Sequence, residues 1–218
     1  MLLQPFYIDK IITTALEEDI HYVDVTTDYL LDDNHTSEAY YLAKDTGVLC
    51  GIDIAKRVFE LAGGNVTMEI LKKDSETVQK GDILARMKGS TKTLLKGERT
   101  ALNLLQHMSG IATATAECVA LVAGTRAQIT DTRKTLPGLR QLQKYAVTVG
   151  GAKNHRYNLS DGAMLKDNHI GAAGSVAKAI EMAKEYCPFV RKIEIEVENL
   201  DMVKEAADAG ADIIMLDN

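Results

Sequence analysis

The first 90 residues alternate between helical and strand-like patterns of apolar and polar positions. Apolar side chains recur at helical spacing in two stretches, the first capped by Asp9 and the second ended by two glycines: residues 9–19 and 51–64. Runs bounded by turn residues predict strands in three others: residues 37–49, 66–74 and 81–89. This mixture predicts a first domain of α+β type, in which a small sheet packs on a helix.

Residues 93–124 are long, apolar and rich in Ala and Leu, which predicts one or two mostly buried helices. Gly110 is expected to mark a break or a point of close packing. Judged from its neighbours alone, Arg99 is expected to form a surface ion pair with Glu98 or another acid. His107 is expected to be a helix-surface or packing residue.

After residue 124 the pattern changes to strands that alternate with helices. Strand-like runs occupy four stretches: residues 127–131, 162–167, 191–198 and 211–217. Helical spacing occupies the stretches between them: residues 137–151, 174–186 and 199–210. This alternation predicts βα units and a parallel sheet, either open or closed into a barrel.

The composition excludes several classes of protein. The chain has 218 residues, no apolar run near the roughly 18 residues of a membrane span, and no secretory leader at its start. We therefore expect a cytoplasmic protein without a membrane anchor. The net charge of −6 argues against general nucleic-acid binding. The three cysteines are far apart and odd in number, so we expect buried reduced thiols and neither disulfides nor a zinc site.

The charge is distributed unevenly, with cations concentrated in residues 131–170. Seven Lys and Arg residues against three Asp residues leave a net charge of +4 there, so the remaining chain carries −10. A solvated basic loop is one interpretation of such a run. Glycines and asparagines lie between the cations and let the backbone approach a ligand, which favours a small ligand with several anionic groups.

Charged side chains also stand at the ends of the predicted strands. These residues are Asp131, Lys166, Glu196 or Glu198, and Asp217. Active sites of β/α barrels are built at the C-terminal ends of the strands, so this distribution is typical of a barrel enzyme. Strand alternation alone does not separate Glu194, Glu196 and Glu198 as candidates, and their use as the polar side of a strand is the simpler alternative.

Several segments resemble quinolinate phosphoribosyltransferases. The segments that carry the resemblance are LEEDI, DVTT, GERTALNLLQHMSGIAT, DTRKTLPGLRQLQKYAVTVGGAKNHR, MLKDNHI, EIEVENL and ADIIMLDN. The resemblance implies an N-terminal α/β sandwich domain over residues 1–100 and an α/β barrel over residues 101–218. Because chains of the family continue beyond the position of residue 218, the barrel is expected to be incomplete here.

The resemblance also implies a reaction, its ligands and its residues. Quinolinate and phosphoribosyl pyrophosphate would give nicotinate mononucleotide, pyrophosphate and CO₂ in NAD biosynthesis, with Mg²⁺ as cofactor. A homodimer with shared active sites is implied, and higher oligomers stay open. The implied substrate-binding residues are Arg99 from the partner subunit, Thr132, Arg133, Lys134, His155, Arg156, Lys166, Glu196 and Asp217. Lys134, Lys166, Glu196 and Asp217 are the implied catalytic residues, and Glu196 and Asp217 would face the ribose and Mg²⁺, mostly through substrate.

Two alternatives stay open at this point. Lys166 at a strand end could form a Schiff base, as lysines of barrel lyases do, and borohydride trapping with a carbonyl substrate would reveal it. A relative without activity could instead bind the anionic ligand without turnover, which calorimetry would detect.

Overall fold

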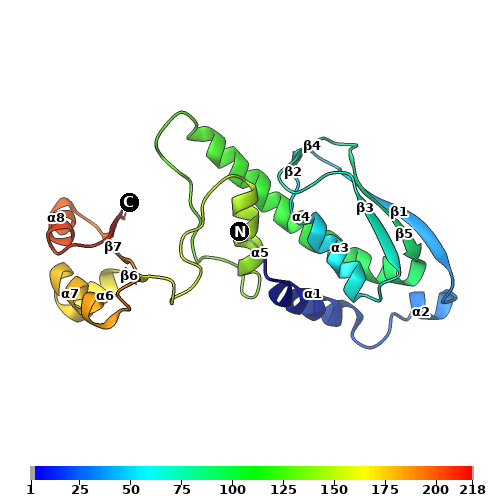
Figure 1. Ribbon diagram of the computed structural model, residues 1–218, viewed down its shortest axis with the longest axis horizontal. Helices are drawn as coiled ribbons and strands as arrows, with labels where there is room; N and C mark the ends of the chain where they lie inside the picture. The colour runs from blue at the N-terminus through cyan, green and yellow to red at the C-terminus, as the bar shows by residue number, and fades with distance from the viewer. Residues whose placement is uncertain (1–2, 218) are drawn as a thin grey trace. The chain divides into compact units, whose positions relative to one another are not determined.

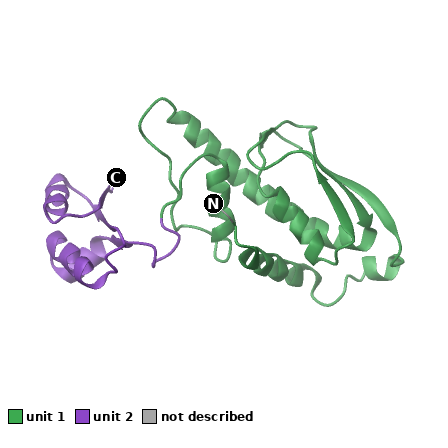
Figure 2. Cartoon of the chain, viewed as in Figure 1, with its two compact units in different colours: residues 1–155 green, residues 156–218 purple. Residues whose placement is uncertain are grey.

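The protein is described by a computed structural model over residues 3–217, which divides into two compact units (Figure 2). Unit 1 ends at His155 and unit 2 begins at Arg156. Asn218, the last residue of the ADIIMLDN motif, lies outside the described residues. Unit 1 has two sheets, unit 2 has one, and each unit has its own apolar core.

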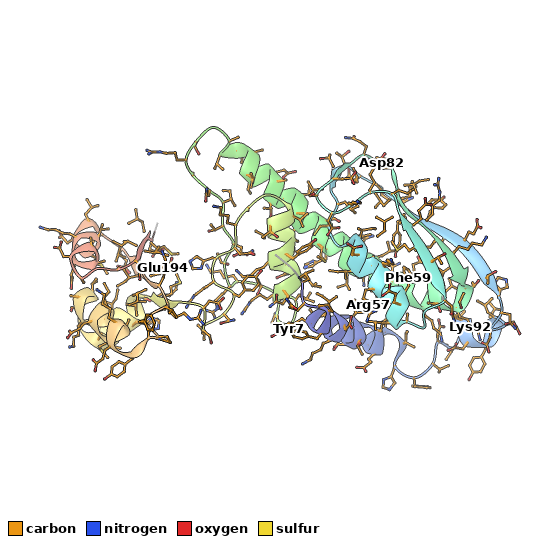
Figure 3. The ribbon with its side chains drawn as sticks, in the orientation of Figure 1. Tyr7, Arg57, Phe59, Asp82, Lys92 and Glu194 are labelled. Carbon is orange, nitrogen blue, oxygen red and sulfur yellow. The ribbon has the colours of Figure 1, made fainter. Side chains whose placement is uncertain are left out.

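Unit 1 contains helices and short antiparallel sheets (Figure 1). Its elements are α1 (Pro5–Ile20), α2 (Thr27–Leu30), β1 (Thr36–Leu42), β2 (Gly47–Val48), α3 (Ile52–Leu61), β3 (Val66–Ile70), β4 (Thr77–Val78), β5 (Ile83–Ser90), α4 (Thr91–Leu121) and α5 (Arg140–Val149). The predicted cap at Asp9 is wrong, because α1 already begins at Pro5, where the missing N–H of proline leaves no helical hydrogen bond unmade. Asp9 instead pairs with Arg57 of α3, which is labelled in Figure 3.

The sheets of unit 1 are both antiparallel. One has the order β1-β5-β3 and the other pairs β2 with β4. The strand predicted over residues 37–49 is two strands, because residues 43–46 bend out of the ladder. The core is closed by α3 and α4, with Val58 and Phe59 of α3 and Met108 of α4 all at most 3% exposed.

Helix α4 is a single helix of 31 residues. Gly110 neither breaks it nor packs closely, since a Cβ there would meet no atom within 4 Å, so that prediction was wrong. The close contact is made by Gly97, where a Cβ would lie 2.7 Å from Cδ1 of Phe59. Glycine is therefore needed at residue 97 for α3 and α4 to approach one another.

The end of unit 1 holds α5 and the loops around it. The helix predicted over residues 137–151 is present as α5. The strand predicted over residues 127–131 is not formed, and only a single parallel bridge joins Thr130 to Lys153. Residues 126–128 are exposed and pair with no strand in the described part of the chain.

Unit 2 is a parallel α/β layer. Its elements are β6 (Ala163–Leu165), α6 (Asp167–Ala173), α7 (Val176–Tyr186), β7 (Ile193–Val197), α8 (Leu200–Asp208) and β8 (Ile213–Leu216). The strands lie in the order β6-β7-β8 and are parallel, as the alternation of strands and helices predicts. Ile180, Ile195 and Ala206 are fully buried between helices and sheet. Over the described residues this sheet is open, so the barrel is incomplete as expected.

The predicted boundary between residues 100 and 101 falls inside α4, whereas the compact units divide at residues 155 and 156. The boundary stays a prediction. No helix within residues 3–217 combines the length and apolarity needed to cross a bilayer. All three cysteines are free thiols, but only Cys50 is buried, and burial raises the pKa of its thiol. The expectation of burial was wrong for Cys118, which is exposed.

Candidate active site

The site residues expected in unit 1 lie mostly in a cationic loop, residues 132–135, which follows the Thr130–Lys153 bridge. The Oγ1 atom of Thr132 accepts a hydrogen bond from the N–H of Lys134 at 3.0 Å and forms a tight turn. Arg140 of α5 donates to Thr135 Oγ1 at 3.0 Å and to the carbonyl oxygen of Arg133 at 3.4 Å. The loop is thus held from its inner side, and the side chains of Thr132 and Lys134 are exposed.

Arg133 carries an unsatisfied donor. Its Nε atom is buried and donates to no acceptor within residues 3–217. A buried donor left without an acceptor costs about 1–3 kcal/mol, so such a group calls for an acceptor from a ligand or from water. A guanidinium with a free buried N–H next to an exposed lysine is suited to bind a carboxylate or phosphate.

Two of the seven cations in residues 131–170, Lys144 and Arg140, are bound by other protein groups and are not presented to a ligand. Lys144 is 1% exposed in its side chain and is ion-paired with Asp131 at 2.5 Å. Arg140 is bound to the loop itself, as described above. Both therefore support the loop, and the count of seven cations overstates the charge that a ligand would meet.

His155 lies at the end of unit 1 and is half-buried. Its backbone N–H donates to Oδ1 of Asp131 at 2.8 Å. Asp131 directly precedes the cationic loop, so the same carboxylate fixes the start of that loop and the backbone of residue 155.

Arg99 lies on α4 and is exposed. The surface ion pair expected from its neighbours is not found, because no acid of the described chain lies within ion-pair distance of its guanidinium. His107, in the same helix, is a packing residue as expected. Its Nε2 lies 2.9 Å from Nε2 of Gln143, whose Oε1 accepts a hydrogen bond from the N–H of Leu136.

The site residues expected in unit 2 lie at the C-terminal ends of its parallel strands. Lys166 follows β6, Glu196 is near the end of β7, and Asp217 follows β8. The Nζ atom of Lys166 donates to Oε2 of Glu196 at 2.5 Å, with side chains 44% and 20% exposed. The structure thus brings together two of the site residues that were expected at strand ends.

The three glutamates that the sequence left open have different surroundings. Glu194, which is labelled in Figure 3, is 5% exposed. It lies in the central strand of the sheet, in the register row of Met164 and Ile213. Glu198 follows the strand and is exposed. Only Glu196 is both partly accessible and paired with a strand-end lysine, so it is the best candidate of the three to meet a ligand.

Arg156 and His169 of unit 2 form hydrogen bonds with backbone groups next to β6. Arg156 donates from Nη1 to the carbonyl oxygen of Gly162 at 2.9 Å, at the start of β6. His169 accepts a hydrogen bond on Nδ1 from the N–H of Lys166 at 3.0 Å, which caps α6 and fixes the turn after β6. Sequence reasoning missed this role of His169, although its position three residues after Lys166 is the spacing of a capping contact.

Sequence reasoning also missed that Lys144 and Asp131 form a pair. The burial of Lys144 could not be predicted from Leu142 and Ala146, because residues two positions apart in a helix do not lie on the same face. A buried lysine needs an acid as partner. The partner could not be chosen from sequence, because Asp131 is 13 residues away in a loop.

Two family models match most of the chain. Residues 24–109 match the family model described as quinolinate phosphoribosyl transferase, N-terminal domain, and residues 111–218 match the C-terminal domain of the same family. A nicotinate-nucleotide pyrophosphorylase [carboxylating] of Mycobacterium leprae is 41% identical over 210 residues, covering 95% of this chain and 74% of that protein. The chain belongs to the quinolinate phosphoribosyltransferase family.

Solved structures of the family have the same fold. The crystal structure of NadC from Streptococcus pyogenes matches with a TM-score of 0.95 and 49% identity, covering 100% of this chain and 77% of that one. The nicotinate-nucleotide pyrophosphorylase from Francisella tularensis matches with a TM-score of 0.94 and 37% identity, covering 100% and 76%. The predicted fold class, a sandwich domain followed by an incomplete α/β barrel, is confirmed.

Proposed function

We propose that this quinolinate phosphoribosyltransferase transfers the phosphoribosyl group of phosphoribosyl pyrophosphate to quinolinate and releases pyrophosphate and CO₂, leaving nicotinate mononucleotide. Relatives that are at least 41% identical carry the name of this carboxylating pyrophosphorylase, which supports the proposal. The observation within the chain that carries it is the buried, unsatisfied Nε of Arg133 beside the exposed Lys134. Such a donor set suits an anionic acceptor.

Quinolinate has two adjacent carboxylates, which require more than one cation. Within unit 1 the proposed partners are Arg133 and Lys134, with Thr132 and His155 as hydrogen-bonding neighbours. Within unit 2 the residues that the family resemblance implies for this role are Arg156 and Lys166. Arginine supplies a planar fork for one carboxylate and lysine a mobile point charge for the other. Lys166 would exchange part of its bond to Glu196 for the substrate carboxylate.

The acidic strand ends of unit 2 suit the donor substrate. As the pyridine nitrogen attacks the anomeric carbon of the ribose, the pyrophosphate leaves with the bonding electron pair, and positive charge develops on the ribosyl ring. We propose that the carboxylates of Glu196 and Asp217 stabilise this charge and orient the ribose hydroxyls. Loss of CO₂ then leaves an electron pair on C2 of the ring, which a cation such as Lys134 or Lys166 would stabilise until C2 takes a proton.

Glu196 and Asp217 also suit a magnesium ion that binds together with phosphoribosyl pyrophosphate. Within residues 3–217 no three His, Cys, Asp or Glu side chains are arranged to hold a metal ion by themselves. Mg²⁺ in phosphate-transfer sites is commonly held by one or two carboxylates together with substrate phosphates, and Glu196 and Asp217 could provide those carboxylates. When bound, the ion would neutralise charge on the leaving pyrophosphate.

Arg99 is proposed to act from a partner subunit in a homodimer. Its guanidinium is exposed and has no ion-pair partner in the described chain, which supports a role toward a ligand or another chain. We also propose that the protein is a homodimer and that it is cytoplasmic, as expected from the sequence.

The proposed function is tested by incubating the protein with quinolinate, phosphoribosyl pyrophosphate and Mg²⁺, and measuring nicotinate mononucleotide by mass spectrometry. Product should form only when both substrates are present. The Schiff-base alternative is tested in separate samples that contain a carbonyl substrate and borohydride, in which no adduct should be trapped at Lys166. Absence of product, together with calorimetric binding of quinolinate, would favour a binding protein without activity.

A further inference from the structure

A buried ion pair in unit 1 joins Lys144 to Asp131, the residue that directly precedes the cationic loop. Lys144 of α5 and Asp131 are 1% and 8% exposed in their side chains, and Nζ of Lys144 lies 2.5 Å from Oδ1 of Asp131. No substrate could reach an ammonium that is this deeply buried, so Lys144 does not bind a ligand directly.

The pair holds both backbone polar groups of a single residue. The N–H of His155 donates to Oδ1 of Asp131 at 2.8 Å, and Nζ of Lys144 donates to the carbonyl oxygen of His155 at 3.0 Å. The two charges that bind one another therefore also fix the peptide groups on either side of the His155 Cα atom. This restricts the backbone dihedral angles from which the imidazole projects.

Asn154 makes further hydrogen bonds to both residues of the pair. Its Nδ2 atom donates to Oδ2 of Asp131 at 2.6 Å and to the carbonyl oxygen of Lys144 at 2.9 Å. The backbone of Asp131 is also bound, since its N–H donates to the carbonyl oxygen of Lys153 at 3.2 Å. The loop that ends at His155 and the loop that begins at Thr132 are thus tied to one carboxylate.

A buried ion pair is a costly way to stabilise a fold, because an apolar pair of the same volume is often equally stable or more stable. A buried ion pair differs from an apolar pair in that its hydrogen bonds are directional. Each charged group accepts or donates several hydrogen bonds at preferred angles and so fixes the groups that it binds. Here those bonds end on the backbone of a residue that lies in the proposed quinolinate site.

We propose that Asp131 and Lys144 are positioning residues that hold the His155 backbone so that its side chain meets the anionic acceptor. The inference rests on the proposed function for the identity of the acceptor. The pair contributes no charge to the ligand and acts only through the place it gives to His155.

The test replaces the pair by Asp131→Leu/Lys144→Met, which fills the same space with apolar groups and orphans no charge. The matched control is Asp82→Leu/Lys72→Met, which removes another ion pair of unit 1. The pair variant should raise KM for quinolinate about tenfold or more and leave KM for phosphoribosyl pyrophosphate within about twofold. The control should change neither KM.

Coupling to His155 separates positioning from general stability. In a His155→Ala background the same pair substitution should change KM for quinolinate by less than about twofold, because the residue through which it acts is gone. A full tenfold effect in that background, equal changes in both KM values, or no change at all would overturn the proposal.

Hydrogen exchange gives a second readout that needs no turnover. The His155 amide should exchange at least about tenfold faster in the pair variant than in wild type, as measured by NMR on the full chain. If the pair variant does not fold, Asn154→Ala should speed the same exchange and raise the same KM to a smaller extent, and unchanged values would overturn the proposal. A wild-type protein that does not turn over quinolinate refutes the proposed function, whereas unaltered His155 exchange refutes the positioning pair.

Discussion

Lys166 and Glu196 form an ion pair at the C-terminal ends of neighbouring parallel strands, with Nζ and Oε2 separated by 2.5 Å. Lys166 is close to half exposed and Glu196 is one-fifth exposed, so the pair borders solvent and does not belong to the core. Exposed or partly exposed pairs contribute little to stability. The pair is therefore better explained by the charges that it presents to a ligand.

Lys166→Ala should lower kcat/KM about 100-fold or more, because the variant loses a charge that the proposed mechanism uses at the substrate carboxylate and at C2. Stability should change by less than about 1 kcal/mol, since the side chain is partly exposed. Lys44→Ala is the matched control, because Lys44 is an exposed lysine outside the proposed site. Steady-state kinetics and thermal unfolding measure both quantities, and an unchanged kcat/KM would remove Lys166 from the site.

Glu196→Gln should lower kcat/KM for phosphoribosyl pyrophosphate by about tenfold or more, because a neutral amide stabilises a developing positive charge less than a carboxylate does. Glu198→Gln should stay within about twofold of wild type, since Glu198 is exposed and beyond the strand. Both variants replace one carboxylate oxygen by an amide nitrogen. A difference between them therefore reports where the glutamate stands and not the kind of substitution. A larger loss for Glu198→Gln would reverse the assignment.

Nicotinate should be turned over at least roughly 1,000-fold less efficiently than quinolinate, because a site built for two carboxylates would leave a cation uncompensated when one carboxylate is missing. The comparison is made by measuring nicotinate mononucleotide from each acceptor at equal concentrations. Equal rates would show that the cations of the site do not select a dicarboxylate.

Arg99→Ala and Lys166→Ala proteins should each have little activity alone, and activity should return when they are co-refolded. In a mixed dimer, one site carries both defects and the other carries neither, so about one quarter of wild-type activity is expected after random pairing. Mass spectrometry verifies subunit exchange. Verified exchange without recovery would contradict the action of Arg99 from the partner subunit.

The contact between α1 and α3 should depend on pH. The hydrogen bond from Arg57 holds the pKa of Asp9 below its usual value, so the contact stabilises the fold above the unfolded-state pKa of about 4 and is lost as pH falls through the lower folded-state pKa. Asp9→Asn should therefore be less stable than wild type at pH 7. The difference should shrink below about pH 4 in urea unfolding, and a difference that grows there would contradict the assignment.

The sequence was sufficient for the periodic elements. Strict alternation over residues 191–198 correctly predicted β7, and the apolar spacing that precedes Gly63 and Gly64 correctly predicted α3. Residues 127–131 have the same local appearance as a strand, yet they form only a bridge, because a strand also needs a paired neighbour that sequence does not reveal. Gly97 and Gly110 likewise differ in their neighbours, because Phe59 and Ala62 lie opposite Gly97 and no atom lies within 4 Å of a Cβ at Gly110.

The candidate site was predictable in kind but not in detail. The charge of the segment indicated anion binding, and the family motif chose Glu196 among three alternating acids. The buried pairing of Lys144 with Asp131, and of each with the His155 backbone, depends on how two loops and a helix meet. Local sequence carries no signal for such long-range partners, so Lys144 was included in the positive charge that favoured an anionic ligand.

The central claim, that the chain couples phosphoribosyl transfer to decarboxylation, is tested most directly by stoichiometry. Quinolinate labelled with ¹³C in its 2-carboxylate is incubated with the protein, phosphoribosyl pyrophosphate and Mg²⁺, and labelled CO₂, pyrophosphate and nicotinate mononucleotide are measured in the same sample. We predict that the three products form in equal amounts and that none forms when phosphoribosyl pyrophosphate is omitted. Labelled CO₂ released without pyrophosphate, or a mononucleotide that keeps the label, would contradict the account.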